Sequence, residues 1–140
     1  MEQGIRINKY LSGAGYCSRR EADRLVGEGR VRIGDMTADV GSRVMPGEDV
    51  YVDEKKIVPE EETVLLAVNK PRGIVCTATD KQGSNNIVDF IGYNKRIYPV
   101  GRLDKDSEGL LFMTNDGEMM NKILKGKNGH EKEYIVEVNR

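Results

Sequence analysis

The chain has 140 residues, with 22 Lys and Arg against 23 Asp and Glu, which gives a formal net charge of −1. Hydrophobic residues make up 38% and charged residues 32%, which provides enough apolar side chains for a core and excludes a disordered or collagen-like chain. No apolar run approaches the roughly 20 residues of a membrane-spanning helix, and the N-terminus, MEQGIRINKY, lacks the apolar segment of a secretion signal. We therefore expect a cytoplasmic protein whose binding preferences depend on where its charges lie rather than on their sum.

Zinc-binding spacings and serine or cysteine nucleophiles paired with a histidine are missing from the sequence. Cys17 and Cys76 are far apart, and His130 is the only histidine, so no zinc-ligand spacing occurs. We expect both cysteines to be small, partly buried hydrophobic residues in a reducing compartment. The glycine and lysine spacing of a P-loop does not occur, and His130 has no serine or cysteine nucleophile beside it.

The charges are unevenly spread and divide the chain near Pro59. Residues 1–32 carry seven basic and four acidic side chains, a local net charge of +3. Residues 53–62, DEKKIVPEEE, are charged and have little apolar content, which is typical of a solvated linker. We therefore expect two domains, residues 1–58 and residues 59–140.

The first domain is expected to contain two helices followed by a small sheet. Apolar side chains at helical spacing predict one helix around residues 7–11 and a second helix over residues 19–26. Ser18 and Glu21 have the spacing of a capping box, so the second helix should begin at Ser18 and end at the glycines that follow. Short β segments are expected at residues 31–33, 43–44 and 50–52.

The second domain is expected to have an α+β arrangement on a mixed sheet. The predicted strands are residues 64–68, 74–79, 98–103, 110–114 and 134–138, and residues 80–86 form a polar loop. A short helix is expected at residues 87–91, and a second helix, capped by Asn115 or Asp116, carries Met119, Met120, Ile123 and Leu124. Because the strands outnumber the helices that could cover them, we expect the chain to be part of a longer protein.

The first domain offers a basic face as a candidate binding site. Arg19 and Arg20 follow Ser18 at a helix start, where backbone N–H groups and the helix dipole already favour an anion. Arg24 lies on the same helix face as Arg20, and a guanidinium can donate two parallel hydrogen bonds to a phosphate. Arg6, Lys9 and Arg30 complete the candidate set. The alternative is an ordinary solvated face that the neighbouring acidic residues partly neutralise.

The turn at residues 101–111, GRLDKDSEGLL, is the second candidate site. A turn held between strands can present a reactive side chain to a cleft. Asp104 directly follows Leu103, and its carboxylate could be a nucleophile, a general base or a metal ligand. The alternative is structural, because alternate acidic residues such as Asp104 and Asp106 are also common in turns.

Lys132 and Tyr134 form the third candidate site. They alternate on a predicted strand, so both face the same side. A tyrosine beside a cation can stack on a nucleobase while the cation holds a phosphate. The alternative is a tyrosine that packs across the sheet among charged neighbours.

These motifs together resemble a known family. Residues 6–52, with INKYLSGAGYCSRREADRLVGEGRVRIG and the later PGEDVYVD, resemble an S4 RNA-binding domain. The motifs NKPRG at residues 69–73, YPVGRLD at 98–104 and GLLFMTNDGE at 109–118 resemble the RsuA-like family of ribosomal RNA pseudouridine synthases. With SRREAD, NKIL and residues 130–134 included, the chain is similar to the RluF type, which modifies 23S ribosomal RNA. The resemblance covers nearly the whole chain, and its motifs occur in the family's order.

The resemblance implies isomerisation of uridine to pseudouridine without cofactor or metal. Asp104 matches the catalytic aspartate, which attacks or deprotonates at the ribose as the glycosidic bond breaks, and the residues leave both roles open. Tyr134 matches the tyrosine that stacks on the target base, and Arg102 lies in the motif that organises the catalytic loop. A uridine inside a helix is out of reach, so the base must be flipped out while the S4 domain positions the RNA. The expected partner is 23S ribosomal RNA, with transfer RNA as a second candidate, and the protein is expected to be a monomer.

The family pattern also predicts what this sequence lacks. Family members continue beyond the strand at residues 134–138 with more sheet and a basic motif that lies against the catalytic aspartate. The chain is therefore expected to be the N-terminal portion of an enzyme, and to bind RNA with little or no turnover by itself. The alternative is an S4-type adaptor that binds RNA without catalysis, although an adaptor has no use for the GRLDKDSEGLL turn.

Overall fold

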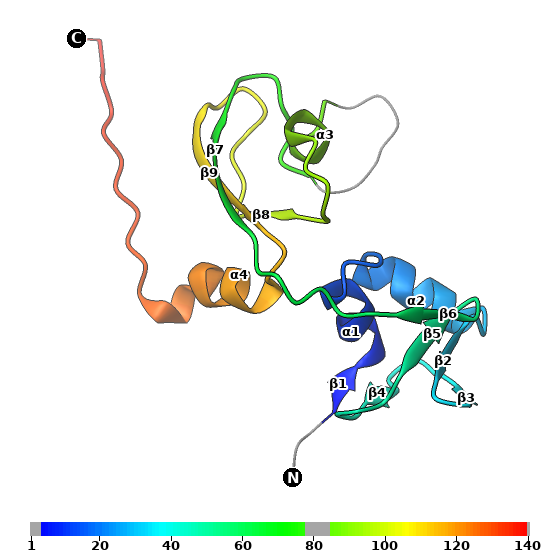
Figure 1. Ribbon diagram of the computed structural model, residues 1–140. Coiled ribbons are helices and arrows are strands. Elements are labelled where there is room, and N and C mark those ends of the chain that lie inside the picture. Colours follow the sequence, from blue (N-terminus) through cyan, green and yellow to red (C-terminus); the bar gives the residue numbers. More distant parts are fainter. Residues whose placement is uncertain (1–3, 78–84, 140) are drawn as a thin grey trace.

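A computed structural model describes residues 4–77 and 85–139 and shows two groups of elements, each with its own hydrophobic cluster (Figure 1). The first group contains β1 (Ile5–Arg6), α1 (Ile7–Gly13), α2 (Arg19–Gly27), β2 (Val31–Ile33), β3 (Met36–Thr37), β4 (Arg43–Val44), β5 (Val50–Val52) and β6 (Lys55–Ile57). The second group contains β7 (Leu65–Lys70), α3 (Ile87–Ile91), β8 (Tyr98–Val100), β9 (Gly109–Thr114), α4 (Gly117–Leu124) and the 3-10 helix η1 (Gly126–Asn128). The predicted α+β fold class is confirmed.

In the first group, α1 and α2 pack together and share a core with an antiparallel sheet of order β3-β2-β5-β6. The predicted apolar face of α2 is buried, and it meets Leu11 of α1 and Val50 of β5 in the same cluster. Ser18 Oγ accepts the Glu21 backbone N–H at 3.1 Å, as the capping pattern predicts. The Glu21 carboxylate does not return this bond in full capping-box fashion but binds Arg24 instead. Both predicted helices are therefore confirmed.

The connection between the two groups is shorter than the predicted linker. Asp53 and Glu54 occupy the left-handed region, with φ of 47° and 64°, and form a two-residue hairpin turn in which Val52 pairs with Lys55. β6 then adds to the sheet edge, and Ile57 is buried in the core. The prediction that residues 53–57 are linker is wrong, because their exposed charges belong to the β5–β6 hairpin, which Val50, Val52 and Ile57 anchor in the core. Residues 58–64 form the irregular connection.

The second group is built on a sheet of order β7-β9-β8, which is antiparallel at both pairings. A mixed sheet is not seen, and the parallel pairing among the described residues is an isolated bridge between Val75 and Asn86. This bridge replaces most of the strand predicted at residues 74–79, of which 78 and 79 lie outside the described residues, as do residues 80–84 of the predicted polar loop. Helix α3 occupies the predicted residues, and Ile87 packs with Leu111 and Met113 in the core.

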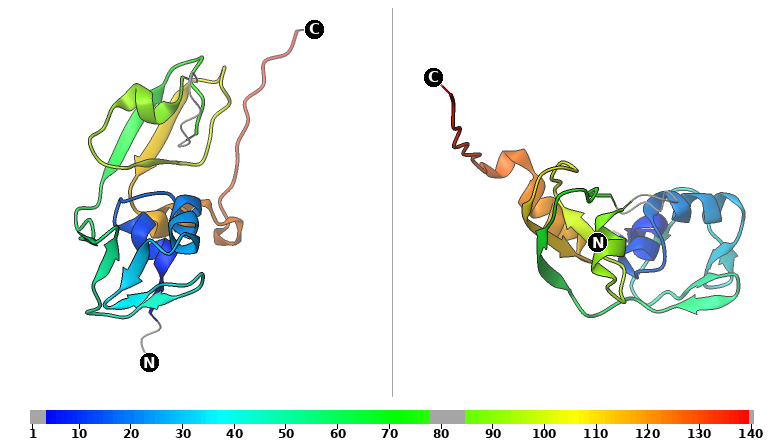
Figure 2. Two further views of the ribbon diagram at one scale, coloured as in Figure 1. Left: turned by 90° about the vertical axis from the view of Figure 1, so that its right-hand side faces the viewer. Right: turned by 90° about the horizontal axis from the view of Figure 1, so that it is seen from above.

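The strand predicted at residues 134–138 is wrong. Residues 129–139 have no regular secondary structure and run away from both groups of elements (Figures 1 and 2). Ile135 is 93% exposed, and Tyr134, Val136 and Val138 are exposed as well. The alternating pattern suits a strand, but a strand also needs a neighbouring backbone, and neither β7 nor β8 pairs with this segment. Within the described ranges, no helix combines the length and the apolar character that crossing a membrane requires.

Candidate active site and RNA-binding surface

Asp104 lies in the turn between β8 and β9. The Ser107 N–H donates to the Asp104 carbonyl at 3.0 Å and closes this turn. The side chain of Asp104 is exposed, and within residues 4–77 and 85–139 it forms no hydrogen bond or ion pair. The carboxylate is therefore available to a ligand, as a nucleophile or a base must be.

A buried lysine holds this turn from behind. Lys70, at the end of β7, is 0% exposed, and its Nζ donates to the carbonyl oxygens of Pro71 at 2.9 Å, Lys105 at 3.1 Å and Ser107 at 2.6 Å. Three acceptors use all three N–H bonds of an ammonium group. The Gly73 N–H also donates to the Lys105 carbonyl at 2.7 Å, which ties the Arg72–Gly73 turn to the Asp104 turn. The backbone that carries Asp104 is thus fixed although its carboxylate is free.

The residues that flank the turn have further contacts. The Leu103 N–H donates to Cys76 Sγ at 3.4 Å, and Leu103 packs against the core. On the other side, Arg72 Nε lies 3.7 Å from a Glu108 carboxylate oxygen in an exposed ion pair. Cys76 is buried and Cys17 is half-buried, which agrees with the expected structural role, and burial raises the pKa of Cys17.

The three predicted catalytic side chains do not meet in this structure. Arg102 lies two positions before Asp104 and is exposed. Tyr134 is 78% exposed on the extended C-terminal segment, and Lys132 lies on the same segment. Within the described ranges no hydrogen bond or ion pair joins Asp104 to Arg102 or Tyr134. The roles of these residues stay predictions.

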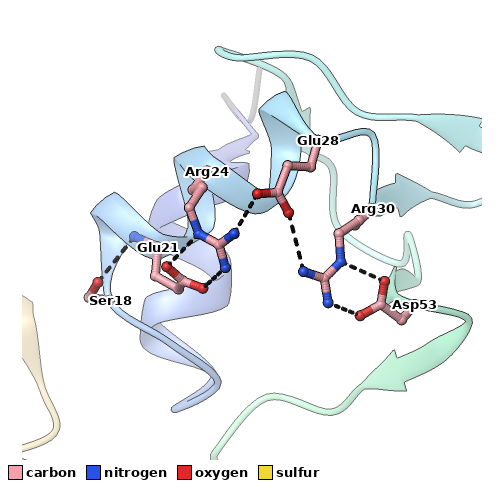
Figure 3. Close-up of polar contacts among 6 residues, drawn as sticks. All are labelled: Ser18, Glu21, Arg24, Glu28, Arg30 and Asp53. Atoms are coloured by element: carbon pink, nitrogen blue, oxygen red, sulfur yellow. Dashed lines mark hydrogen bonds and ion pairs between the residues drawn. The ribbon is translucent and has the colours of Figure 1, made fainter.

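Part of the predicted basic face is an ion-pair chain along α2 (Figure 3). Arg24 binds Glu21 on one side and Glu28 on the other, Glu28 also binds Arg30, and Arg30 binds Asp53 of the β5–β6 turn. The hydrogen bonds that Arg24 and Arg30 donate to these carboxylates raise the pKa of both guanidiniums, and the Arg30 guanidinium lowers the pKa of Asp53. All these groups are exposed, and exposed ion pairs are weak enough to exchange with a phosphate.

The other members of the basic face differ in their partners. Lys9 Nζ binds Glu118 of α4 at 2.5 Å, which links the two groups of elements. In contrast, Arg6, Arg19 and Arg20 are exposed and have no carboxylate partner in the part of the chain that the structure describes. The sequence did not reveal which cations are paired, because Asp53 and Glu118 are distant in sequence from their partners. The free guanidiniums are the stronger candidates for an anionic ligand.

Comparisons with known proteins match both parts of the chain. Residues 5–57 match the family model of the S4 domain, and residues 64–140 match the model described as RNA pseudouridylate synthase. The chain is 50% identical to the dual-specificity RNA pseudouridine synthase RluF of Escherichia coli K12, over 99% of this chain and 48% of the relative. It is 39% identical to the ribosomal large subunit pseudouridine synthase B of Bacillus subtilis, over 95% of this chain and 55% of the relative.

A solved structure described as a crystal structure of pseudouridylate synthase is 25% identical to the chain, with a TM-score of 0.46, and the match covers 89% of this chain and 54% of the other. The chain spans about half the length of the curated relatives reported above. The family-model match over residues 64–140 covers more than half of the chain and includes the turn that carries Asp104. The chain therefore belongs to the RNA pseudouridylate synthase family, with an S4 domain ahead of the synthase region.

Proposed function

We propose that the protein isomerises a specific uridine of 23S ribosomal RNA to pseudouridine, with transfer RNA as a second candidate substrate. One observation supports this most strongly: a free carboxylate, Asp104, stands on a fixed turn in a chain that is half identical to RluF over nearly its whole length. The proposal divides the chain into an S4 domain, residues 1–58, and a synthase portion, residues 59–140. It places the protein in the cytoplasm as a monomer that uses no metal or cofactor.

The proposed chemistry needs one carboxylate and no redox partner. The bond from ribose C1′ to uracil N1 breaks, a bond from C1′ to C5 forms, and the proton on C5 is lost while N1 gains one. Asp104 would either attack at the ribose or remove a proton from it, and both routes leave the carboxylate regenerated at the end. Its exposed position is suited to a nucleotide that has been flipped out of its helix.

The remaining site residues have separate proposed roles. Tyr134 would stack on the flipped base, a contact worth about 1–3 kcal/mol, and Lys132 would hold a neighbouring phosphate. Arg102 would organise the turn around Asp104. Because Tyr134 now lies on an exposed segment, these contacts require the segment to move toward Asp104 when RNA binds. We therefore expect slow turnover by this chain alone.

The proposed RNA-binding surface is the basic face of the S4 domain. Arg6, Arg19 and Arg20 would contact backbone phosphates directly, since their guanidiniums are free among the described residues. Lys9, Arg24 and Arg30 would first have to release carboxylates. Ser18 supports the surface by capping the helix that carries Arg19 and Arg20.

Tritium release from 5-tritiated uridine in 23S ribosomal RNA tests the proposal, with the chain in excess over RNA and full-length RluF of Escherichia coli as the positive control. Asp104→Asn should abolish release while RNA affinity stays within a few-fold. Asp106→Asn, a matched change in the same exposed turn, should keep release. Residual release by Asp104→Asn near the wild-type level would contradict the role of Asp104. RNA binding without release by the unmodified chain would favour the adaptor function.

A further inference from the structure

A cavity lies where the S4 domain meets the synthase portion. Its volume is about 360 Å³, and its lining includes Ser12 and Arg19 from one domain with Arg96, Tyr98 and Asn121 from the other. Figure 1 shows α1 and α2 on one side of this junction and β8 and α4 on the other. A ligand in this cavity would therefore touch both domains at once.

Two guanidiniums face this cavity without a carboxylate. Arg96 Nη1 lies 3.4 Å from Ser12 Oγ, and its Cζ lies 5.8 Å from the centre of the Tyr98 ring. Burial raises the pKa of the Tyr98 hydroxyl, the charges of Arg96 and Arg19 oppose this increase, and the Asp116 carboxylate adds to it. Across residues 4–77 and 85–139, neither arginine forms an ion pair, and none of the residues that line the cavity is acidic.

The nearby acidic residues are already engaged elsewhere. Lys95, the neighbour of Arg96 in sequence, binds Glu60 and Glu62 of the connection. Asp116 caps α4, where its carboxylate accepts the N–H groups of Glu118 and Met119. Glu118 in turn binds Lys9. The positive charge at the cavity is thus left for an anion from outside the chain.

We propose that Arg19 and Arg96 together bind one backbone phosphate of the RNA in this cavity. The proposal rests on the proposed function and adds a residue of the synthase portion to the RNA-binding surface. Planar guanidiniums donate paired hydrogen bonds to phosphate oxygens, and the Ser12 hydroxyl can add a further donor. The bound phosphate would fix the S4 domain relative to the turn of Asp104. Binding of the RNA by the S4 domain would then also position the target base at Asp104.

The test measures the salt dependence of binding to in vitro transcribed 23S ribosomal RNA. Arg19→Gln and Arg96→Gln should each weaken binding about tenfold and reduce the slope of log K against log salt by up to about 0.9, the value for one phosphate contact. The double variant should lose much less than the product of the single losses, because both side chains serve one phosphate. Arg96→Lys should restore part of the slope, since it keeps the charge.

Lys95→Gln is the matched control. It makes the same change in net charge one position away, but Lys95 is already neutralised by two carboxylates, so the slope should stay unchanged. Unfolding temperatures within about 2 °C of wild type would show that the variants are folded. Equal slopes for Arg96→Gln and the wild-type chain, or equal losses for Arg96→Gln and Lys95→Gln, would overturn the site. A wild-type chain that does not bind RNA would instead contradict the proposed function.

Discussion

Replacing Lys70 by methionine is the sharpest test of how the turn of Asp104 is held. Met keeps the length of the side chain inside the core but removes every N–H donor. The Lys105 carbonyl still accepts the Gly73 N–H, so the carbonyls of Pro71 and Ser107 are the acceptors that lose a donor. The substitution therefore separates the packing of the Lys70 stem from the hydrogen bonds of its ammonium group.

The expected loss of stability follows from these two carbonyls. Both carbonyls accept part-buried hydrogen bonds. An acceptor left without a donor costs up to about 1–3 kcal/mol when it is buried, and removal of the buried charge returns part of this cost because the ammonium group no longer has to be desolvated. We expect the free energy of unfolding to fall by about 2–4 kcal/mol, which lowers the melting temperature of a domain of this size by about 10 °C or more.

Thermal unfolding by circular dichroism measures this loss, and amide hydrogen exchange locates it. The Ser107 and Gly73 amides should exchange faster in Lys70→Met, because both lie in the turns that the ammonium joins. Lys105→Met is the control, since it makes the same chemical change on an exposed side chain of the same turn. A Lys70→Met melting temperature within about 2 °C of the Lys105→Met value, with Ser107 still protected, would refute the reasoning.

Ser18→Ala should destabilise the first domain by about 1 kcal/mol in thermal unfolding, because the Glu21 N–H at the start of α2 loses its acceptor; an unchanged melting temperature would show that the cap is dispensable. Arg20→Ala should flatten the salt dependence of RNA binding more than Arg24→Ala, because Arg24 already binds two carboxylates; equal slopes would argue against this. Lys9 lowers the pKa of Glu118, so ionised Glu118 stabilises the folded chain above its usual pKa, and this contribution is lost as the pH falls through the folded-state value. Glu118→Gln should therefore lose less stability on acidification than the wild-type chain. The same dependence of melting temperature on pH for both proteins, from pH 7 to about pH 3, would disprove this prediction.

Features that depend on neighbouring residues in the sequence could be predicted. Ser18 and Glu21 set the start of α2 because the cap spans one helical turn, and the apolar spacing that follows sets the buried face. Asp116 caps α4 in the same way. The turn that carries Asp104 was also placed correctly between two strands, since its polar residues interrupt two apolar runs.

Features that depend on distant partners could not be predicted. Lys70 binds carbonyls of residues 105 and 107, and a backbone carbonyl leaves no mark in the sequence. The sequence nevertheless indicates that Lys70 is buried. Side chains of β7 alternate between the two faces of the sheet, and Lys70 lies on the inward face with Leu66 and Val68. A charge at such a position needs buried acceptors. The partner of Arg30 is hidden for a different reason: the charged run around Asp53 predicts a linker, whereas the structure forms a hairpin there.

If the proposed function holds, the positions of Asp104 and Tyr134 indicate which part of the site would limit turnover. The turn of Asp104 is held by contacts that exist without RNA. Positioning this residue for the reaction therefore costs little conformational entropy. Tyr134 lies on an exposed segment, and fixing the backbone of residues 130–134 would cost about 1–2 kcal/mol for each residue. Stacking on one base returns only about 1–3 kcal/mol, so stacking alone cannot hold Tyr134 in place. A further contact, such as Lys132 with a phosphate, must supply the rest. Substitutions that strengthen these contacts should therefore raise turnover more than any change around Asp104.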